Sequence, residues 1–384
     1  MMKKTFVLAP DSFKESMTAK QVCVAMETGL KRVFPDARYI HVPMADGGEG
    51  TTQSLIDATG GELFTLQVTG PLGIPVEGCY GIMGSGDTAV IEMASASGIH
   101  YVNQQTKNPL RTTTRGTGEL IRACLDKGIR KIILGIGGSA TNDGGAGMAE
   151  ALGVRFFDKQ GERLAPGGGA LGALHRIDIS GLDNRLAEAD IQVACDVTNP
   201  LCGPQGASTV FGPQKGATPE MVATLDRHLA HYASVISQQL GHDVATTPGA
   251  GAAGGLGAGL MAFTRCTLRK GIEIVVEYSG LSAQLAGADY CFTGEGRIDF
   301  QTRFGKTPYG VAQIARQHQV PVIAVAGSIG DDIGALYDAG IDAIFGIIPH
   351  AAAIESLLHE GTINMERTCE NIGRLMKKTA AVSH

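Results

Sequence analysis

The chain has 384 residues, a formal net charge of −6 at pH 7, no tryptophan and only 5% aromatic residues. This balance gives no basic footprint for nucleic acid or an anionic membrane, and it argues against a stacking platform for single strands. No apolar stretch is long enough for a membrane span, and the run after MMKK is too short for a secretory signal. We therefore expect a cytoplasmic protein whose partner is a small molecule.

The cysteines and the chain length set two further expectations. The eight cysteines include no C-x-x-C pair, and several lie in apolar runs, so we expect small core residues in a reducing compartment. At this length, two domains are the natural expectation. The oligomeric state is left open by the sequence.

The N-terminal elements alternate between strands and helices. Residues 5–9 have the pattern of a buried strand, and Thr18 with Gln21 forms a capping box for the helix that follows. A strand over 39–44 leads into a helix over 51–58. This βαβα order predicts a parallel sheet with helices on its faces.

The middle of the chain has a different pattern. Residues 62–93 contain short β-rich segments separated by glycine and proline turns, which predicts hairpins and a domain boundary near residue 60. Further elements are expected as a helix over 117–127, strands over 131–136 and 191–196, and a helix that begins at Thr218 and ends at Gly241.

The last hundred residues return to strands separated by helical segments, with strands expected over 288–294, 321–327 and 341–349. We therefore expect a discontinuous first domain, in which residues 1–60 and 283–384 share one sheet. Residues 61–282 would form a second, inserted α/β domain with β-hairpin segments and glycine-rich loops.

Residues 131–153, KIILGIGGSATNDGGAGMAEALG, carry the densest functional signal. An apolar strand breaks there into small residues, with a helix expected to start among them: Gly137, Gly138, Ser139, Thr141 and Asn142. Glycine lets a ligand approach the backbone, and N–H groups at a helix start favour an anion such as phosphate. A plain glycine turn is the alternative, but turns rarely need so many small residues in a row.

Polar or glycine residues follow nearly every expected strand, where ligands of open parallel sheets bind. Asp46, Glu49 and Asp196 are the candidates for a metal ligand or a base. Mg²⁺ usually takes one or two protein carboxylates and completes its shell with water and phosphate oxygens. Taken singly, each of these carboxylates is slightly better explained as a helix cap or a turn residue, but their shared position after apolar strands favours a function for the group.

Several cations are candidates for ligand charge. Lys14 and Lys215 would neutralise phosphate, and Arg111 and Arg297 would clamp a carboxylate. Lys306 lies in a GKT sequence but is a weaker candidate, because no glycine stands at the position that a Walker A loop would need.

Two other classes of function stay open on these residues. Residues 135–140 fit G-x-G-x-x-A with Asp158 spaced for a ribose contact, which favours a dinucleotide oxidoreductase. Against it, Gly144, Gly145 and Gly147 would each cost the next helix about 1 kcal/mol. A non-catalytic sensor of a small carboxylate is the third possibility.

The motifs together resemble one family along essentially the whole chain, the bacterial type I glycerate kinases. The blocks are APDSFKES (9–16), MADGGEGT (44–51), GIGGSATNDGGAGM (135–148), CDVTNPLCGPQGA (195–207), FGPQKGA (211–217), GAGAAGGLGAGL (249–260), TGEGRIDFQT (293–302) and GKTP (305–308).

The resemblance implies ATP-dependent phosphorylation of D-glycerate, with 2-phosphoglycerate as the expected product and 3-phosphoglycerate as the alternative. It implies two α/β domains, one of them flavodoxin-like, with the active site in the cleft between them. It also implies a role in glyoxylate, glucarate or galactarate breakdown.

We hypothesise the following roles within that activity. The catalytic candidates are Asp11, Lys14 and Asp196, and the Mg²⁺ ligands are Asp46, Glu49 and Asp196. The candidates for ATP are Gly137, Gly138, Ser139, Lys215, Gly254, Gly255 and Gly257. The candidates for glycerate are Ser12, Arg111, Thr293, Glu295 and Arg297.

Overall fold

The computed structural model describes residues 3–382, which form two compact units. Unit 1 takes in the chain up to Asp46, Gln53–Gly60 and the chain from Ile272 onward. Unit 2 consists of Gly47–Thr52 and Gly61–Gly271. Within residues 3–382, no helix combines the length and apolar character that a membrane crossing requires.

Unit 1 is built on a five-stranded sheet in the order β13-β12-β11-β1-β2, with every neighbouring pair parallel. Its strands are β1 (Thr5–Leu8), β2 (Arg38–His41), β11 (Tyr290–Ile298), β12 (Val322–Ile329) and β13 (Ala343–Gly346). Counted within the unit, this order is 2-1-3-4-5, the flavodoxin-like order. The predicted α/β class and flavodoxin-like sheet are confirmed.

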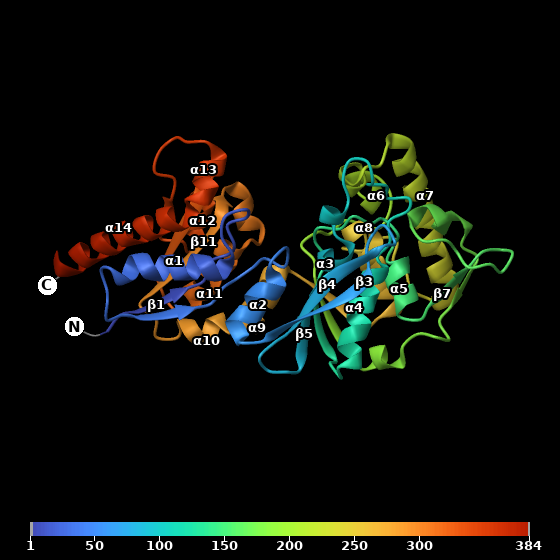
Figure 1. The fold of residues 1–384 in the computed structure, drawn as a ribbon, viewed down its shortest axis with the longest axis horizontal. Helices are drawn as coiled ribbons and strands as arrows, with labels where there is room; N and C mark the ends of the chain where they lie inside the picture. The colour runs from blue at the N-terminus through green and yellow to red at the C-terminus, as the bar shows by residue number, and fades with distance from the viewer. Residues whose placement is uncertain (1–2, 383–384) are drawn as a thin grey trace. The chain divides into compact units, whose positions relative to one another are not determined.

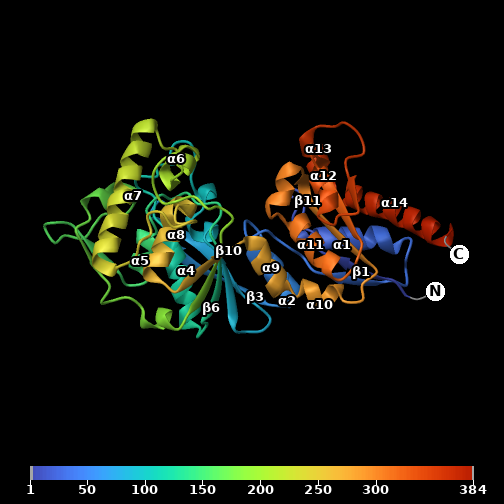
Figure 2. The same ribbon diagram turned by 180° about the vertical axis from the view of Figure 1, so that it is seen from behind.

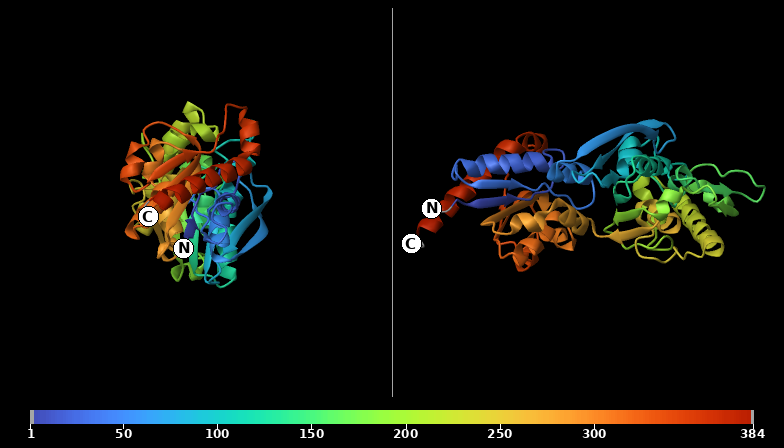
Figure 3. Two further views of the ribbon diagram at one scale, coloured as in Figure 1. Left: turned by 90° about the vertical axis from the view of Figure 1, so that its left-hand side faces the viewer. Right: turned by 90° about the horizontal axis from the view of Figure 1, so that it is seen from below.

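Unit 1 also contains helical elements. They are α1 (Ala19–Lys31), α2 (Thr51–Thr59, which starts in unit 2), α9 (Gly271–Ser279), α10 (Leu281–Leu285), η5 (Phe300–Phe304), α11 (Thr307–Gln317), α12 (Gly334–Asp338), α13 (Ile354–His359) and α14 (Gly361–Val382). Among them, α1 and α11 contact the sheet. The α1 and α14 helices lie side by side (Figures 1 and 3) and bury their apolar sides with Phe6, Leu8 and Phe292. The predicted capping box is confirmed, since Thr18 and Gln21 exchange both hydrogen bonds.

Unit 2 is built on a six-stranded sheet in the order β10-β9-β6-β5-β4-β3. Its strands are β3 (Glu62–Thr69), β4 (Pro75–Ile82), β5 (Thr88–Glu92), β6 (Lys131–Gly135), β9 (Asp190–Ala194) and β10 (Cys266–Arg269). The β3–β4 and β4–β5 pairs are antiparallel, which confirms the predicted hairpins, and the other pairs are parallel. A separate antiparallel pair joins β7 (Arg155–Phe157) to β8 (Arg176–Asp178).

The helical elements of unit 2 are mostly short. They are α3 (Ala94–Ser97), η1 (Ile99–Tyr101), α4 (Arg115–Asp126), α5 (Ala146–Ala151), η2 (Gly168–Ala173), η3 (Asn184–Ala187), α6 (Ala207–Phe211), η4 (Pro213–Lys215), α7 (Pro219–Leu240) and α8 (Ala252–Phe263). The α5 helix contacts both α4 and α8 (Figure 2). As predicted, α7 begins after Thr218 and ends at a left-handed Gly241.

Two elements differ from the sequence expectation. The strand expected over 39–44 ends at His41. Val42 N and Met44 N still donate to Leu8 O and Pro10 O, but Pro10 has no N–H to donate to Val42 O, so the ladder with β1 stops there. The glycine-rich run over 248–259 is helical only at its end. The bounds of α8 start at Ala252, but Ala253, Gly254 and Gly255 have left-handed φ values, so the regular right-handed helix runs on from Leu256. The sequence predicted a glycine-rich loop here, and tertiary packing overrides the low helix propensity of glycine at the end of the run.

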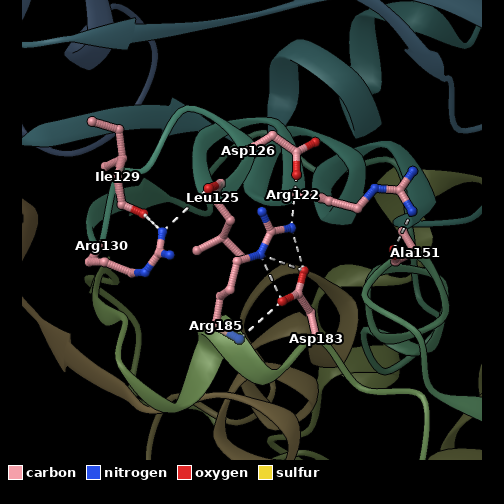
Figure 4. Close-up of polar contacts among 8 residues, drawn as sticks. All are labelled: Arg122, Leu125, Asp126, Ile129, Arg130, Ala151, Asp183 and Arg185. Carbon is pink, nitrogen blue, oxygen red and sulfur yellow. Dashed lines mark hydrogen bonds and ion pairs between the residues drawn. The ribbon is translucent and has the colours of Figure 1, made fainter.

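A polar network fixes the end of unit 2 at which β6 begins (Figure 4). Arg185 bridges Asp183 and Asp126, and its Nη2 lies 2.7 and 2.8 Å from their carboxylates. Arg130 donates to the carbonyl of Leu125 at the end of α4. These contacts hold α4 to the start of β6, and the opposite end of the strand leads into the candidate site.

Substitution of Gly29 in α1 tests the α1–α14 packing. A methyl group there would overlap the backbone carbonyl of Glu366 in α14. Alanine gains about 1 kcal/mol in helix propensity, but overpacking against backbone costs about 1–3 kcal/mol. Because the overlap is with rigid backbone, we expect a cost near the upper end, so that Gly29→Ala lowers the free energy of unfolding by about 1–2 kcal/mol in urea titrations. The control is Gly334→Ala in α12, where the added methyl meets open space; equal effects of the two substitutions would contradict the packing argument.

Candidate functional site

The loop that follows β6 presents unused backbone donors. Gly137 and Gly138 are exposed, and Gly138 has a left-handed backbone with φ of 71°. Among residues 3–382, no acceptor takes the N–H groups of Gly137, Gly138 or Ser139. A Cβ on Gly137 would meet only Gly48 Cα, at 3.7 Å. Three successive N–H groups without an acceptor, two of them on exposed glycines, suit an anion.

The expected helix start within residues 139–142 is wrong. The α5 helix begins at Ala146, because Gly144 and Gly145 take left-handed φ values of 64° and 75° that a right-handed helix cannot continue through. Ser139, Thr141 and Asn142 therefore lie in the loop before the helix.

The buried Asp143, which sequence reasoning missed, takes the place of a bound anion at this helix start. Its carboxylate accepts hydrogen bonds from Thr114 N (2.8 Å), Thr114 Oγ1 (2.9 Å), Gly145 N (3.2 Å) and Gly147 N (3.2 Å). Burial raises its pKa, and these hydrogen bonds lower it. An aspartate directly before two glycines and an apolar run is a helix-start signal that could have identified it.

The predicted pairing of Lys215 with the loop is visible in the geometry. Lys215 ends η4 and is 2% exposed. Its Nζ donates to Ser139 Oγ at 2.7 Å and to Thr141 O at 2.6 Å. Burial lowers the pKa of Lys215 to about 7, and nearby Asp143 opposes the shift. The buried amine thus fixes the loop from beneath, while its role toward a ligand stays a prediction.

The second glycine stretch has a packing role. Gly254 lies against Thr141 O, and its own carbonyl accepts the N–H of Gly144 at 3.0 Å. A Cβ on Gly255 would stand 2.8 Å from Gly144 Cα, and Gly257 lies against the carbonyl of Gly249. These buried glycines let α8 support the loop; nucleotide contact at Gly254, Gly255 and Gly257 stays a prediction.

The segment 47–52 is held by Glu92, another residue that sequence reasoning missed. Glu92 ends β5, and its carboxylate accepts the N–H groups of Gly50 (3.2 Å) and Thr52 (2.7 Å) at the start of α2. Burial raises its pKa, and these donors lower it. Glu49 is exposed within this segment. The exposed Asp196 accepts the N–H of Gly271 at 3.1 Å, also within unit 2.

In unit 1, Asp11 lies directly beyond β1, at the switch point between β1 and β11 where flavodoxin-like folds bind ligands. Its carboxylate accepts Ser12 N at 2.6 Å and Thr307 Oγ1, at the start of α11, also at 2.6 Å. Burial and the neighbouring Asp46 raise the pKa of Asp11 to about 6. The structure therefore brings Asp11, Ser12 and Asp46 together.

Glu295 in β11 belongs to the same group. It is 8% exposed, and it accepts Thr302 Oγ1 at 2.6 Å. Lys306 Nζ lies 3.6 Å from its other oxygen, so the lysine that the sequence ranked weakest joins these carboxylates. Burial raises the pKa of Glu295 to about 7; Thr302 and Lys306 oppose this, and Asp11 adds to it.

Of the remaining candidate site residues, Thr293 is buried and the others are exposed. Thr293 is fully buried and donates to Ala9 O at 2.8 Å, which gives it a role in holding β11 to the end of β1. Lys14 in unit 1 and Arg111 in unit 2 are exposed. Arg297 has a side chain that is 68% exposed and lies 3.0 Å from the Asp299 carboxylate.

The donors fit Mg²⁺ only as a partner of phosphate. Within residues 3–382, no three His, Cys, Asp or Glu side chains gather to hold a metal ion by themselves. Mg²⁺ needs just one or two carboxylates when phosphate oxygens complete its shell, and the hard oxygens of Asp46, Glu49 and Asp196 are of the kind that it prefers.

Taken together, the flavodoxin-like sheet, the open glycine loop and the desolvated carboxylates define an α/β protein suited to a small anionic ligand. The dinucleotide alternative loses its support, because Asp158 follows β7 in the separate antiparallel pair and caps its own turn through Gln160 N and Glu162 N. A ribose contact requires a neighbouring strand of the parallel sheet.

Comparison with known proteins narrows this class to one family. Residues 6–377 match the glycerate kinase family. The chain is 54% identical to a glycerate kinase of Bacillus subtilis, over 97% of each chain. It is 51% identical to the glycerate 2-kinase of Escherichia coli K12, over 95% of this chain and 96% of the relative. A crystal structure from Salmonella typhimurium LT2, provisionally named glycerate kinase 2, superposes with a TM-score of 0.91 at 51% identity and covers 99% of this chain and 100% of its own. The chain belongs to the glycerate kinase family.

The two glycine stretches are expected to respond differently to alanine. Gly254→Ala would force a methyl into the backbone of the 136–145 loop from a left-handed position, so the free energy of unfolding should fall by about 2 kcal/mol or more. Gly137→Ala has room and should leave stability within about 0.5 kcal/mol while it weakens ATP binding. Urea unfolding and ATP titration measure the two effects. A stable Gly254→Ala protein with weakened ATP binding would instead assign that glycine to the nucleotide.

The raised pKa of Glu295 predicts a pH-dependent stability. Between the ordinary value of 4.5 and the folded value of about 7, the native state holds a proton that the unfolded chain has released. Glu295 therefore contributes stability below pH 4.5 that is lost as pH rises through 7. We expect the Tm of Glu295→Gln to rise relative to wild type between about pH 5 and 7 and to level off above about pH 8. Glu355→Gln, at an exposed position in the same unit, controls for charge removal; a Tm difference independent of pH would refute the assignment.

Proposed function

We propose that this chain transfers the γ-phosphoryl group of ATP to the 2-hydroxyl of D-glycerate and yields 2-phospho-D-glycerate. The observation that carries the proposal is the loop of Gly137, Gly138 and Ser139, whose three N–H groups have no acceptor within residues 3–382 and which combines two exposed glycines with a contact to the buried Lys215. Membership of the glycerate kinase family supplies the reaction class, and the name of the Escherichia coli relative favours the 2-position.

Phosphoryl transfer depends on positioning and on stabilising charge rather than on covalent chemistry. We propose that the loop N–H groups bind phosphate oxygens of ATP. These donors are fixed before the ligand arrives, so they need no reorganisation during transfer. When bound with ATP, Mg²⁺ supplies charge neutralisation, and its protein ligands would come from Asp46, Glu49 and Asp196.

The proton of the glycerate hydroxyl needs an acceptor as the phosphoryl group arrives. Asp11 is our first candidate, because Thr307 and Ser12 hold its carboxylate in a fixed orientation. Asp196 remains the alternative. Lys14 would balance the charge on the transferred group.

Ligands for the glycerate carboxylate and hydroxyl groups are proposed from the predicted set. Ser12 and Glu295 belong to the enclosed group around Asp11, and the exposed guanidinium groups of Arg111 and Arg297 suit a carboxylate. Thr293 would act indirectly, because its hydroxyl donates to Ala9 O and so positions β11 beside the end of β1.

Two further proposals concern the domain division and the cellular location. We propose that unit 1 and unit 2 are the two domains expected at 1–60 with 283–384 and at 61–282. A cytoplasmic location is supported by the eight cysteines, each of which carries a free thiol.

The reaction itself is tested by incubation of the protein with MgATP and D-glycerate and analysis by phosphorus NMR. We expect ADP and 2-phosphoglycerate in equal amounts, and we expect Asp11→Asn to lower kcat by about 10²–10⁴-fold. A 3-phosphoglycerate signal would move the attack to the other hydroxyl. Stabilisation by glycerate without ADP release would favour the sensor, and an Asp11→Asn variant with full turnover would transfer the base to Asp196.

A further inference from the structure

Lys215 is buried too deeply to serve as an open phosphate ligand. It is 2% exposed, and its Nζ uses two N–H groups on acceptors inside unit 2, Ser139 Oγ and Thr141 O. Either charge state of a lysine amine has enough N–H groups for both bonds. An effect of Lys215 on a ligand therefore has to pass through the residues that it holds.

Ser139 is the point at which this buried contact reaches the loop surface. Its side chain is 9% exposed, and it directly follows the exposed Gly137 and Gly138. A hydroxyl has one proton to donate and lone pairs that accept. Because Ser139 Oγ accepts from Lys215, its own proton must point away from the lysine. Hydrogen bonds in such a chain also polarise one another, which strengthens the outer donor.

The second contact of Lys215 fixes the loop on the other side of Ser139. Thr141 O accepts from Nζ at 2.6 Å, whereas the buried Thr141 Oγ1 and Asn142 Oδ1 have no hydrogen-bond partner among residues 3–382. The side-chain oxygens of these two residues therefore do not hold the loop. Gly254, which packs on Thr141 O from α8, supports the same carbonyl.

From this geometry we infer that Lys215 is a positioning residue for ATP. It acts through Ser139, whose hydroxyl donates to a phosphate oxygen of the nucleotide, and it makes no contact with ATP itself. The inference rests on the proposed function of the loop and deepens it, because it replaces a direct charge contact with a relay through one hydroxyl.

A double-mutant cycle separates a relay from a direct contact. We expect Ser139→Ala and Lys215→Met each to lower kcat/KM for ATP by about 10- to 100-fold. In the double variant the loss should equal that of the more impaired single variant to within about twofold, because both substitutions remove the same donor. The KM for glycerate should stay within about twofold of wild type, which a general loss of structure would not allow. Ser139→Thr keeps the hydroxyl and should restore most of the activity.

Three measurements keep the result interpretable. The matched control is Lys131→Met, a lysine exposed at the start of β6 and paired with Asp87, which should leave kcat/KM for ATP unchanged. Urea unfolding shows which variants are folded, and Lys215→Leu, which also removes the donor, replaces Lys215→Met in the cycle if the latter does not fold. If wild type makes no phosphoglycerate, the proposed function is wrong. If wild type is active but the two fold-losses multiply in the double variant, Lys215 contacts ATP directly and the relay is wrong.

Discussion

The 136–145 loop must leave backbone donors open to a ligand while it stays in one conformation, and the surrounding structure of unit 2 meets that constraint. Unused N–H groups at exposed glycines would normally bring mobility, since glycine has the most backbone freedom to lose. Three contacts fix the loop. Lys215 donates to Ser139, Asp143 accepts the N–H of Gly145, and the glycines of α8 pack against the loop backbone. Rigid donors are what phosphoryl transfer needs, because preorganised dipoles act without reorganisation.

Unit 1 also holds its candidate functional groups in fixed orientations by hydrogen bonds, but these groups are buried carboxylates rather than N–H donors. Asp11 and Glu295 are desolvated carboxylates whose pKa values are raised, and hydroxyl groups from Thr307 and Thr302 fix their orientation. Burial of a carboxylate costs stability unless it is neutralised or hydrogen-bonded. Burial of the two carboxylates therefore lowers the stability of the fold but fixes their orientation, as is common for functional groups of enzymes.

Sequence reasoning predicted most of the architecture and many of the residues in these groups. The flavodoxin-like sheet, the hairpins and the Thr18 capping box follow from patterns that act over a few residues, and all are present. It missed Glu92, because only the fold brings the N–H groups of Gly50 and Thr52 within reach of this carboxylate. For Asp143 the local helix-start signal was present but unused, whereas its contact with Thr114 depends on the fold. It undervalued Lys306, since the comparison with a Walker A loop could not show that Glu295 would lie beside the lysine. The ligand roles themselves remain predictions.

Two segments that are similarly rich in glycine need glycine for different physical reasons. Gly137 lies where a side chain would meet almost nothing, so its small size matters only if something else approaches. Gly254 lies where a side chain would meet the loop backbone, so packing already requires a glycine there. At the starts of α2 and α5, the carboxylates of Glu92 and Asp143 already accept the N–H groups that the helices leave unpaired, which removes two places where an anion would otherwise bind. The internal carboxylates thus direct an incoming phosphate toward residues 137–139, where the donors are left without a partner within the described chain.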